Sequence, residues 1–249
     1  MSKWIAHEVL NQDNGINFIS FPYAGGSPSM FAPWKSEIPP NINFFPVLYP
    51  GRELRKCDPM PEKVDLLVEQ FVHENKELFQ NDFILFGHCT GTLLAYQVLL
   101  EVRRQLGKEP LYLLASGSES PRYIMARERE MGEKLLSSEE VLDNMVKFGL
   151  VDPETAQSVL FQKYYLPIYQ RDLKMLSTYE FTQHEKLNCP IVVLYGSDDS
   201  TLREEAVQDW KAFSEDRVTF KLFKGKHFYF AEDKMPLLMY VRELVKSFT

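Results

Sequence analysis

Residues 87–91 read Gly-His-Cys-Thr-Gly and set a cysteine at the centre of a G-x-C-x-G pentapeptide. The apolar run Asp82–Phe86 precedes it, and an amphipathic helical pattern begins at Thr92. A side chain on so sharp a turn from strand to helix projects above the sheet, and the flanking glycines remove Cβ atoms that would clash across the turn. The helix N-terminus behind Cys89 also favours negative charge and hence the thiolate. The motif therefore predicts a nucleophilic cysteine.

A cysteine nucleophile needs a nearby base and a group that orients the base. In the α/β-hydrolase fold, which this strand–turn–helix pattern predicts, the acid and then the histidine follow the nucleophile along the chain. The run Ile191–Tyr195 leads into Gly-Ser-Asp-Asp, where the usual G-x-x-D spacing selects Asp199 and leaves Asp198 as the alternative. The last expected strand, Val218–Phe223, is followed closely by His227. We therefore predict a Cys-His-Asp triad.

An oxyanion hole needs two backbone N–H donors, one of them from the residue after the nucleophile. That residue is Thr90. The second donor is expected from the loop after the first strand, where Phe21–Ser27 reads Phe-Pro-Tyr-Ala-Gly-Gly-Ser. The paired glycines allow this loop to turn close to the nucleophile. We favour the amide of Tyr23, with that of Ala24 as the alternative.

The remaining histidines and cysteines receive no catalytic role. His88 adjoins the nucleophile, but its side chain is expected to point away from the site. Three other histidines lie outside the loops that follow strands: His7, His73 and His184. Cys57 and Cys189 are expected to be structural, and the three cysteines of the chain lie far apart without a C-x-x-C spacing. Neither a disulfide framework nor a zinc site is indicated.

Short β-rich runs alternate with helical patterns along the chain, which is typical of a mostly parallel sheet with helices on both faces. The expected strands are Asn17–Phe21, Asn43–Tyr49, Asp82–Phe86, Leu111–Ser116, Ile191–Tyr195 and Val218–Phe223. Helices are expected over Val64–Phe79, Leu202–Phe213 and Pro236–Phe248, besides the one that follows the nucleophile.

Residues 121–187 interrupt this alternation with charged helical patterns and no convincing strand. An insertion between two sheet strands at this point of an α/β-hydrolase lies over the catalytic edge. We therefore expect one domain over residues 1–249, with a helical lid over about 121–187.

Composition excludes several classes of function. With 249 residues, a net charge of −7 and a pI near 5.4, the chain lacks the basic balance of a nucleic-acid-binding protein. No apolar run approaches the length of a membrane span, and the first residues lack the apolar core of a signal peptide. A cytoplasmic protein without membrane association is the expectation.

Beyond the nucleophile, the sequence resembles the type II thioesterases that accompany nonribosomal peptide and polyketide synthases. The resemblance spans nearly the whole chain and includes the L-x-P-G-R-E-x-R pattern of Leu48–Arg55. Further matching segments are Phe21–Ser27, Leu166–Asp172, Thr178–Glu180 and Gly225–Phe228.

The resemblance implies a stand-alone enzyme that removes acyl groups from the phosphopantetheine arms of carrier proteins. It implies a monomer with no cofactor or metal, because the triad needs neither and the partner carries the substrate. Arg52 and Arg55 are expected either to approach the carrier protein or its phosphate, or to lie on a solvated loop.

The nucleophile departs from the family's usual G-H-S-x-G. Attack of serine on a thioester gives an oxygen ester, whereas attack of Cys89 gives another thioester of nearly equal energy that stays activated towards thiols and amines. Hydrolysis is the first expectation, and acyl transfer to another carrier or to an amine is the alternative. A hypothesis of another class is an inactive module that only binds carrier proteins.

Overall fold

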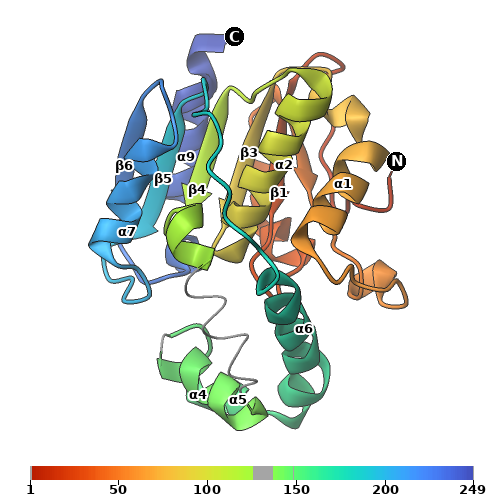
Figure 1. Cartoon of the computed structure of the whole chain (residues 1–249), viewed down its shortest axis with the longest axis vertical. Helices are drawn as coiled ribbons and strands as arrows, with labels where there is room; N and C mark the ends of the chain where they lie inside the picture. Colours follow the sequence, from red (N-terminus) through yellow and green to blue (C-terminus); the bar gives the residue numbers. More distant parts are fainter. Residues whose placement is uncertain (1, 126–136, 148, 249) are drawn as a thin grey trace.

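The computed structural model describes residues 2–125, 137–147 and 149–248. Its centre is a six-stranded sheet of order β2-β1-β3-β4-β5-β6, and every pairing between these strands is parallel (Figure 1). The strands are β1 (Ile16–Phe21), β2 (Ile42–Pro46), β3 (Phe83–His88), β4 (Tyr112–Ser116), β5 (Ile191–Gly196) and β6 (Val218–Phe223). The predicted parallel sheet is confirmed.

Helices cover both faces of the sheet, with α1 and α2 in front of it and α9 behind it in Figure 1. The α-helices of these layers are α1 (Val64–Glu74), α2 (Thr90–Leu106), α7 (Glu204–Gln208), α8 (Tyr229–Glu232) and α9 (Met235–Val245). The 3₁₀ segments are η1 (Pro28–Glu37), η2 (Glu53–Arg55), η3 (Lys76–Phe79), η5 (Asp209–Ala212) and η6 (Lys246–Phe248).

Alternate residues of each strand supply two apolar clusters, one on each face. In β1, Ile19 and Phe21 belong to the cluster that contains the buried residues of α1 and α2. Phe18, the residue before Ile19, belongs to the opposite cluster with Trp34 of η1 and Val241 of α9. Because both faces are covered, the strands read as continuous apolar runs rather than as alternating ones.

Several elements end earlier than the sequence indicates, and the helices expected over residues 202–213 and 236–248 are divided into α7 and η5 and into α9 and η6. β2 stops at Pro46 rather than at residue 49, because the chain then turns towards the N-terminal segment, where the Leu48 amide donates to the Trp4 carbonyl at 2.7 Å. The helix expected over residues 64–79 is divided between α1 and η3. Asn75 lies at the division, and its side-chain amide donates back to the Phe71 carbonyl at 2.6 Å.

Between β4 and β5 the chain forms a separate helical group below the sheet in Figure 1. It comprises α4 (Ser138–Lys147), α5 (Pro153–Gln157), the π-helical η4 (Phe161–Tyr165) and α6 (Leu166–Leu176). Residues 126–136 and 148 of the expected lid lie outside the described residues. Within the described ranges, no helix combines the length and apolar character that crossing a membrane requires.

Candidate active site

Cys89 stands at the junction of β3 and α2 with φ 55° and ψ −125°, a conformation that residues with a side chain rarely adopt. Its own amide donates to the Ser116 carbonyl at 2.8 Å. A Cβ added to Gly87 would overlap the Gly91 carbonyl, and one added to Gly91 would overlap the Phe21 carbonyl. The G-x-C-x-G spacing is therefore a steric requirement of the turn, and it holds the thiol above the carboxyl edge of the sheet.

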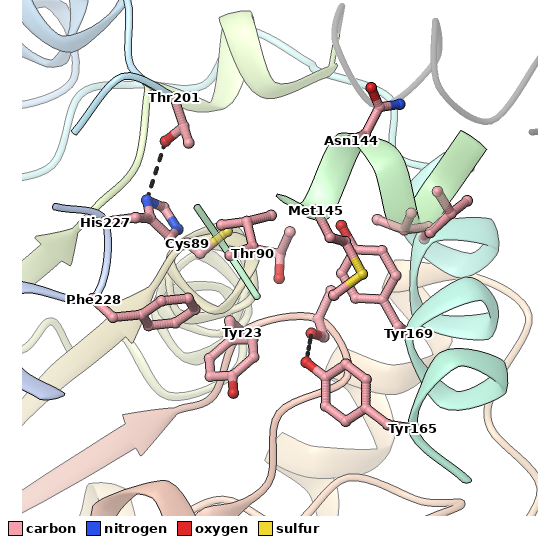
Figure 2. A pocket seen from close by; sticks show the side chains of 14 residues that line it. Tyr23, Cys89, Thr90, Asn144, Met145, Tyr165, Tyr169, Thr201, His227 and Phe228 are labelled. Atoms are coloured by element: carbon pink, nitrogen blue, oxygen red, sulfur yellow. Dashed lines mark hydrogen bonds between the residues drawn. The ribbon is translucent and has the colours of Figure 1, made fainter. Parts of the chain in front are cut away.

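His227 follows β6 and Asp199 follows β5, so both come from loops at the same edge as Cys89. The Nδ1–H of His227 donates to Asp199 Oδ2 at 2.8 Å, and both side chains are almost completely buried. Figure 2 shows the Cys89 sulfur beside the His227 ring. On the other side of the ring, the Cys89 side chain interacts with His227 through its charge and a hydrogen bond.

Thr201 completes the setting of the acid and was not anticipated from the sequence. Its amide and its hydroxyl both donate to Asp199 Oδ1, at 3.0 and 2.6 Å, and its hydroxyl oxygen lies 3.1 Å from His227 Nδ1 (Figure 2). Both oxygens of the carboxylate are thereby engaged. A hydroxyl residue two positions after an aspartate is the sequence pattern that could have indicated this turn.

The two adjacent aspartates have different surroundings. Asp198 is exposed and accepts a hydrogen bond from the Ser197 hydroxyl at 3.0 Å, whereas Asp199 is turned inwards to His227. Of the two candidate acids, only Asp199 is brought to the histidine.

Replacing this carboxylate tests the assignment directly. Asp199→Asn is expected to lower kcat/KM for a thioester by roughly 10²–10⁴-fold, because an amide no longer stabilises the imidazolium and can favour the wrong tautomer. Asp198→Asn, a change of the same chemistry one residue away, should stay within twofold of the wild type. Steady-state kinetics of both variants decide the point. A larger loss in Asp198→Asn would make Asp199 the wrong choice.

The electrostatics of the pair favour an ionised state. Burial alone would lower the pKa of His227, but the charge of the Cys89 thiolate and the contact with Asp199 raise it to about 9. Burial likewise opposes ionisation of Asp199, but hydrogen bonds from His227 and Thr201 hold the pKa of its carboxyl below the usual value. At neutral pH the arrangement is therefore an imidazolium paired with a carboxylate, and this positive charge lies beside the Cys89 sulfur.

His88 points away from the cavity, as expected, but it makes a contact that the sequence did not indicate. It is not among the residues that line the cavity, but its ring lies against His227 with the centroids 4.9 Å apart. His88 Nδ1 is 3.0 Å from the Ser116 hydroxyl, which is 2.8 Å from the Tyr229 hydroxyl. Burial, together with the neighbouring charge of His227, holds the pKa of His88 well below its usual value. His88 is thus a neutral support for the His227 ring.

The predicted oxyanion donors surround the nucleophile. Tyr23, Ala24 and Thr90 all line the same cavity as Cys89. In the described part of the chain, no hydrogen bond engages the backbone amide of any of these three residues, whereas the Gly25 amide donates to Asp172 Oδ2 at 2.7 Å. Thr90 and either Tyr23 or Ala24 can therefore offer N–H groups to a developing oxyanion.

The cavity continues from the triad towards the helices between β4 and β5, and its wall there is mostly apolar (Figure 2). The lining residues from that region are Val141, Asn144, Met145, Leu150, Tyr165, Tyr169 and Leu173. Such a wall suits an acyl chain attached to a carbonyl that reaches Cys89. The arrangement provides a nucleophile, a proton carrier, oxyanion donors and an apolar pocket, which together are the requirements of acyl transfer.

Neither arginine of the Leu48–Arg55 segment is solvated or turned outwards, so the earlier expectation for them is wrong. Arg52 and Arg55 are 3% and 5% exposed. Arg55 pairs with Asp58 at 2.9 Å and lies over the Trp4 ring. Both side chains make their hydrogen bonds and ion pairs inside the protein, so neither is available to a carrier protein.

Among the other cysteines, Cys189 is buried as expected, whereas Cys57 is exposed.

Comparison with known proteins gives a consistent result. A family model described as thioesterase domain matches residues 17–242. The probable anguibactin biosynthesis thioesterase AngT of Vibrio anguillarum is 29% identical over 240 residues, which cover 93% of this chain and 92% of AngT.

Two solved structures resemble the whole fold. RedJ, a thioesterase from the prodiginine biosynthetic pathway of Streptomyces coelicolor, gives a TM-score of 0.82 at 26% sequence identity. The match covers 92% of this chain and 90% of the RedJ chain. BorB, a type II thioesterase from the borrelidin biosynthetic cluster, gives a TM-score of 0.85 at 25% identity over 98% of each chain. With these neighbours, the predicted α/β-hydrolase fold is confirmed.

Proposed function

The chain belongs to the thioesterase domain family and is a thioester hydrolase, and on that premise we propose that it acts as a type II thioesterase on carrier proteins of a nonribosomal peptide or polyketide synthase. Cys89 is the proposed nucleophile, His227 the proton carrier and Asp199 its orienting acid. The observation that carries the proposal is the 2.8 Å contact of His227 Nδ1 with Asp199, which orients the opposite side of the ring towards the Cys89 side chain. Relatives named for anguibactin, prodiginine and borrelidin biosynthesis support this substrate class.

The first step forms an acyl-enzyme. The Cys89 thiolate attacks the thioester carbonyl, and the amides of Thr90 and of Tyr23 or Ala24 hold the resulting oxyanion. When the tetrahedral intermediate collapses, the carbon–sulfur bond to the pantetheine breaks, and the departing thiolate takes the proton of the His227 imidazolium. The products are an acyl-Cys89 thioester, a free pantetheine thiol and a neutral His227.

The second step releases the acid. Neutral His227 takes a proton from water as its oxygen attacks the acyl carbonyl, and the new intermediate expels the Cys89 thiolate. The charge distribution then matches that of the starting enzyme. We also propose that the chain forms one domain, in which the helices α4 to α6 act as a lid that shapes the acyl pocket.

The cysteine supports one competing activity. Acyl-Cys89 retains the energy of a thioester, so a thiol or an amine that enters the site before water would receive the acyl group. The same residues would then perform acyl transfer between carriers or onto an amine. A module that only binds carriers has no use for a buried His227–Asp199 pair beside a thiol, and this pair therefore favours an enzyme.

The raised pKa of His227 predicts different pH profiles for the two steps. Acylation needs the imidazolium to protonate the leaving thiol, so kcat/KM should fall as pH rises through about 9. Acylation removes the Cys89 charge that helps to raise this pKa, so in the acyl-enzyme His227 should lose its proton at lower pH. With deacylation limiting, kcat should therefore increase with pH through the neutral range and lack the decline near 9. Identical profiles for kcat and kcat/KM would contradict the thiolate–imidazolium pair.

Intact-mass spectrometry with an acyl-loaded carrier protein tests the proposed function. The enzyme is mixed with the carrier alone, with a free amine added, or with a second unloaded carrier. Free acid forming at one rate under all three conditions identifies a hydrolase. An acyl adduct on Cys89 that persists in water and discharges only onto the acceptor identifies a transferase. A carrier that binds and keeps its acyl group would support the binding module instead.

A further inference from the structure

Asp172 of α6 connects the lid region to the loop that carries the proposed oxyanion donors. Its Oδ2 accepts a hydrogen bond from the Gly25 amide at 2.7 Å, and its Oδ1 pairs with Arg52 Nη2 at 2.6 Å. Arg52 Nη1 in turn donates to the Gly26 carbonyl at 2.6 Å. Both charged side chains are at most 4% exposed. One carboxylate and one guanidinium thus hold two consecutive residues of the loop.

A second lid contact reaches the same loop from η4. The Tyr165 hydroxyl lies 3.4 Å from the Ala24 carbonyl, an interaction drawn in Figure 2. A Cβ added to Gly25, which has φ +74°, would lie 2.8 Å from the Tyr165 ring. The loop therefore runs flat against the lid and admits only glycine at residue 25. Besides the turn in which the Gly26 amide donates to the Tyr23 carbonyl at 2.8 Å, the loop is held at Ala24, Gly25 and Gly26 by groups that belong to the lid or, in the case of Arg52, pair with it.

The position of these contacts in the chain gives them a consequence for the oxyanion hole. Gly25 and Gly26 directly follow Tyr23 and Ala24, whose amides are the candidate donors. Fixing the peptide plane that carries the Gly25 N–H restrains the preceding plane that carries the Ala24 N–H, because only the two soft torsions of Ala24 lie between them. A buried ion pair is weak evidence for stability as such, but here its members hold the Gly25 amide and the Gly26 carbonyl at 2.7 and 2.6 Å.

Resting on the proposed function, we propose that Asp172 is a positioning residue of the oxyanion hole: through Gly25 and Arg52, the lid helix α6 aims the amide of Tyr23 or Ala24 at the carbonyl attacked by Cys89. The lid then has two linked roles. Helix α6 lines the acyl pocket, and it also orients the loop of residues 22–26 so that this loop can bind the oxyanion. A displaced lid would leave the thiolate in place and remove the oxyanion site.

Two reactions of the same thiolate separate this role from a general structural one. Alkylation of Cys89 by iodoacetamide is a displacement at a saturated carbon and forms no oxyanion, whereas acylation by an acyl-N-acetylcysteamine thioester forms one. Asp172→Asn replaces the carboxylate by a neutral amide of the same shape. Its NH₂ group would then face either the Gly25 amide or Arg52, both of which are donors, so one of the two hydrogen bonds is lost. The acylation rate should fall on the order of 10²-fold. The alkylation rate should remain within twofold of the wild type.

Asp58→Asn provides the matched control, because it breaks another buried arginine's ion pair, that of Arg55, away from the oxyanion loop. Both of its rates should remain within twofold of the wild type. Arg52→Lys is the second variant, and it should show the same selective loss because lysine keeps the charge but cannot bridge Asp172 and Gly26. It also decides the outcome should Asp172→Asn fail to fold.

Other results would overturn the inference. Acylation and alkylation falling together in both variants would reduce Asp172 to a structural residue, and unchanged acylation in both would remove its role altogether. A failure of the proposed function looks different, because wild-type Cys89 would then be alkylated by iodoacetamide and not acylated by the thioester. When the wild type is acylated and Asp172→Asn matches it, only the positioning role is lost.

Discussion

Cys89→Ala is expected to abolish turnover, with kcat on a thioester falling on the order of 10⁴-fold or more. Without the thiolate no acyl-enzyme can form, and water must attack the substrate with only the oxyanion donors and the pocket to assist it. The fold should persist, because alanine keeps the Cβ at the strained turn and removes only one sulfur atom. Kinetics, intact-mass spectrometry for the adduct and a thermal unfolding curve check the three statements. Retention of hydrolysis in a folded Cys89→Ala variant would exclude covalent catalysis at this residue.

Cys89→Ser supplies the informative comparison, since it installs the nucleophile that the sequence pattern of the family leads one to expect. An acyl-serine is an oxygen ester and is less activated towards thiols and amines than an acyl-cysteine. We therefore expect Cys89→Ser to shift the product ratio from acyl transfer towards free acid when an unloaded carrier or an amine is present. Quantifying both products from one reaction gives the ratio directly. An unchanged ratio would mean that access to the site, and not the identity of the nucleophile, sets the fate of the acyl group.

Much of this site could be predicted because catalytic residues in this fold lie in the loops that follow the strands. Cys89, Asp199 and His227 follow β3, β5 and β6, and the carboxyl ends of parallel strands share one edge of the sheet. The spacing of the elements along the chain was therefore enough to bring the three residues together. The choice between Asp199 and its neighbour Asp198 rested only on a motif. The side chains of two consecutive loop residues point in different directions, and spacing along the chain does not show which one points to the histidine.

The placement of His88 shows what a local motif leaves out. The turn at residue 89 fixes how the backbone leaves β3, but the surroundings of His88 come from residues 227–230, more than a hundred positions later. The rings of His227, Phe228 and Phe230 close around it within 5.1 Å between centroids. A residue pointing away from the cavity can thus still support the catalytic ring from behind.

The Arg52–Asp172 pair illustrates the same point at longer range. Its members are 120 positions apart and lie in two segments that match family patterns, and nothing in those patterns paired the two residues. Charged residues on loops are normally solvated, and this general expectation failed because the lid helix α6 buries both groups. Only the packing of the lid against the loop of residues 22–26 reveals the partnership.

His227→Ala is expected to be nearly as damaging as loss of the nucleophile, and it separates the two steps of the reaction. At neutral pH the variant lacks the imidazolium that pairs with the thiolate, so alkylation of Cys89 by iodoacetamide should slow and become strongly dependent on pH, as for an ordinary thiol. In the wild type His227 stays charged up to about pH 9, so alkylation should already be fast at neutral pH. Turnover should fall on the order of 10⁴-fold, because water then has no proton acceptor.

At alkaline pH the thiol of His227→Ala ionises without help, and acylation by an activated thioester should recover. Deacylation should not recover, since the neutral imidazole that would activate water is gone. The acyl-enzyme should therefore accumulate and be visible as a stable mass adduct on Cys89. His73→Ala, on the exposed side of α1, is the matched histidine control and should behave as the wild type. An adduct of His227→Ala that hydrolyses at the wild-type rate would require another base, and His88, lying directly against the vacated ring position, would be the first residue to test.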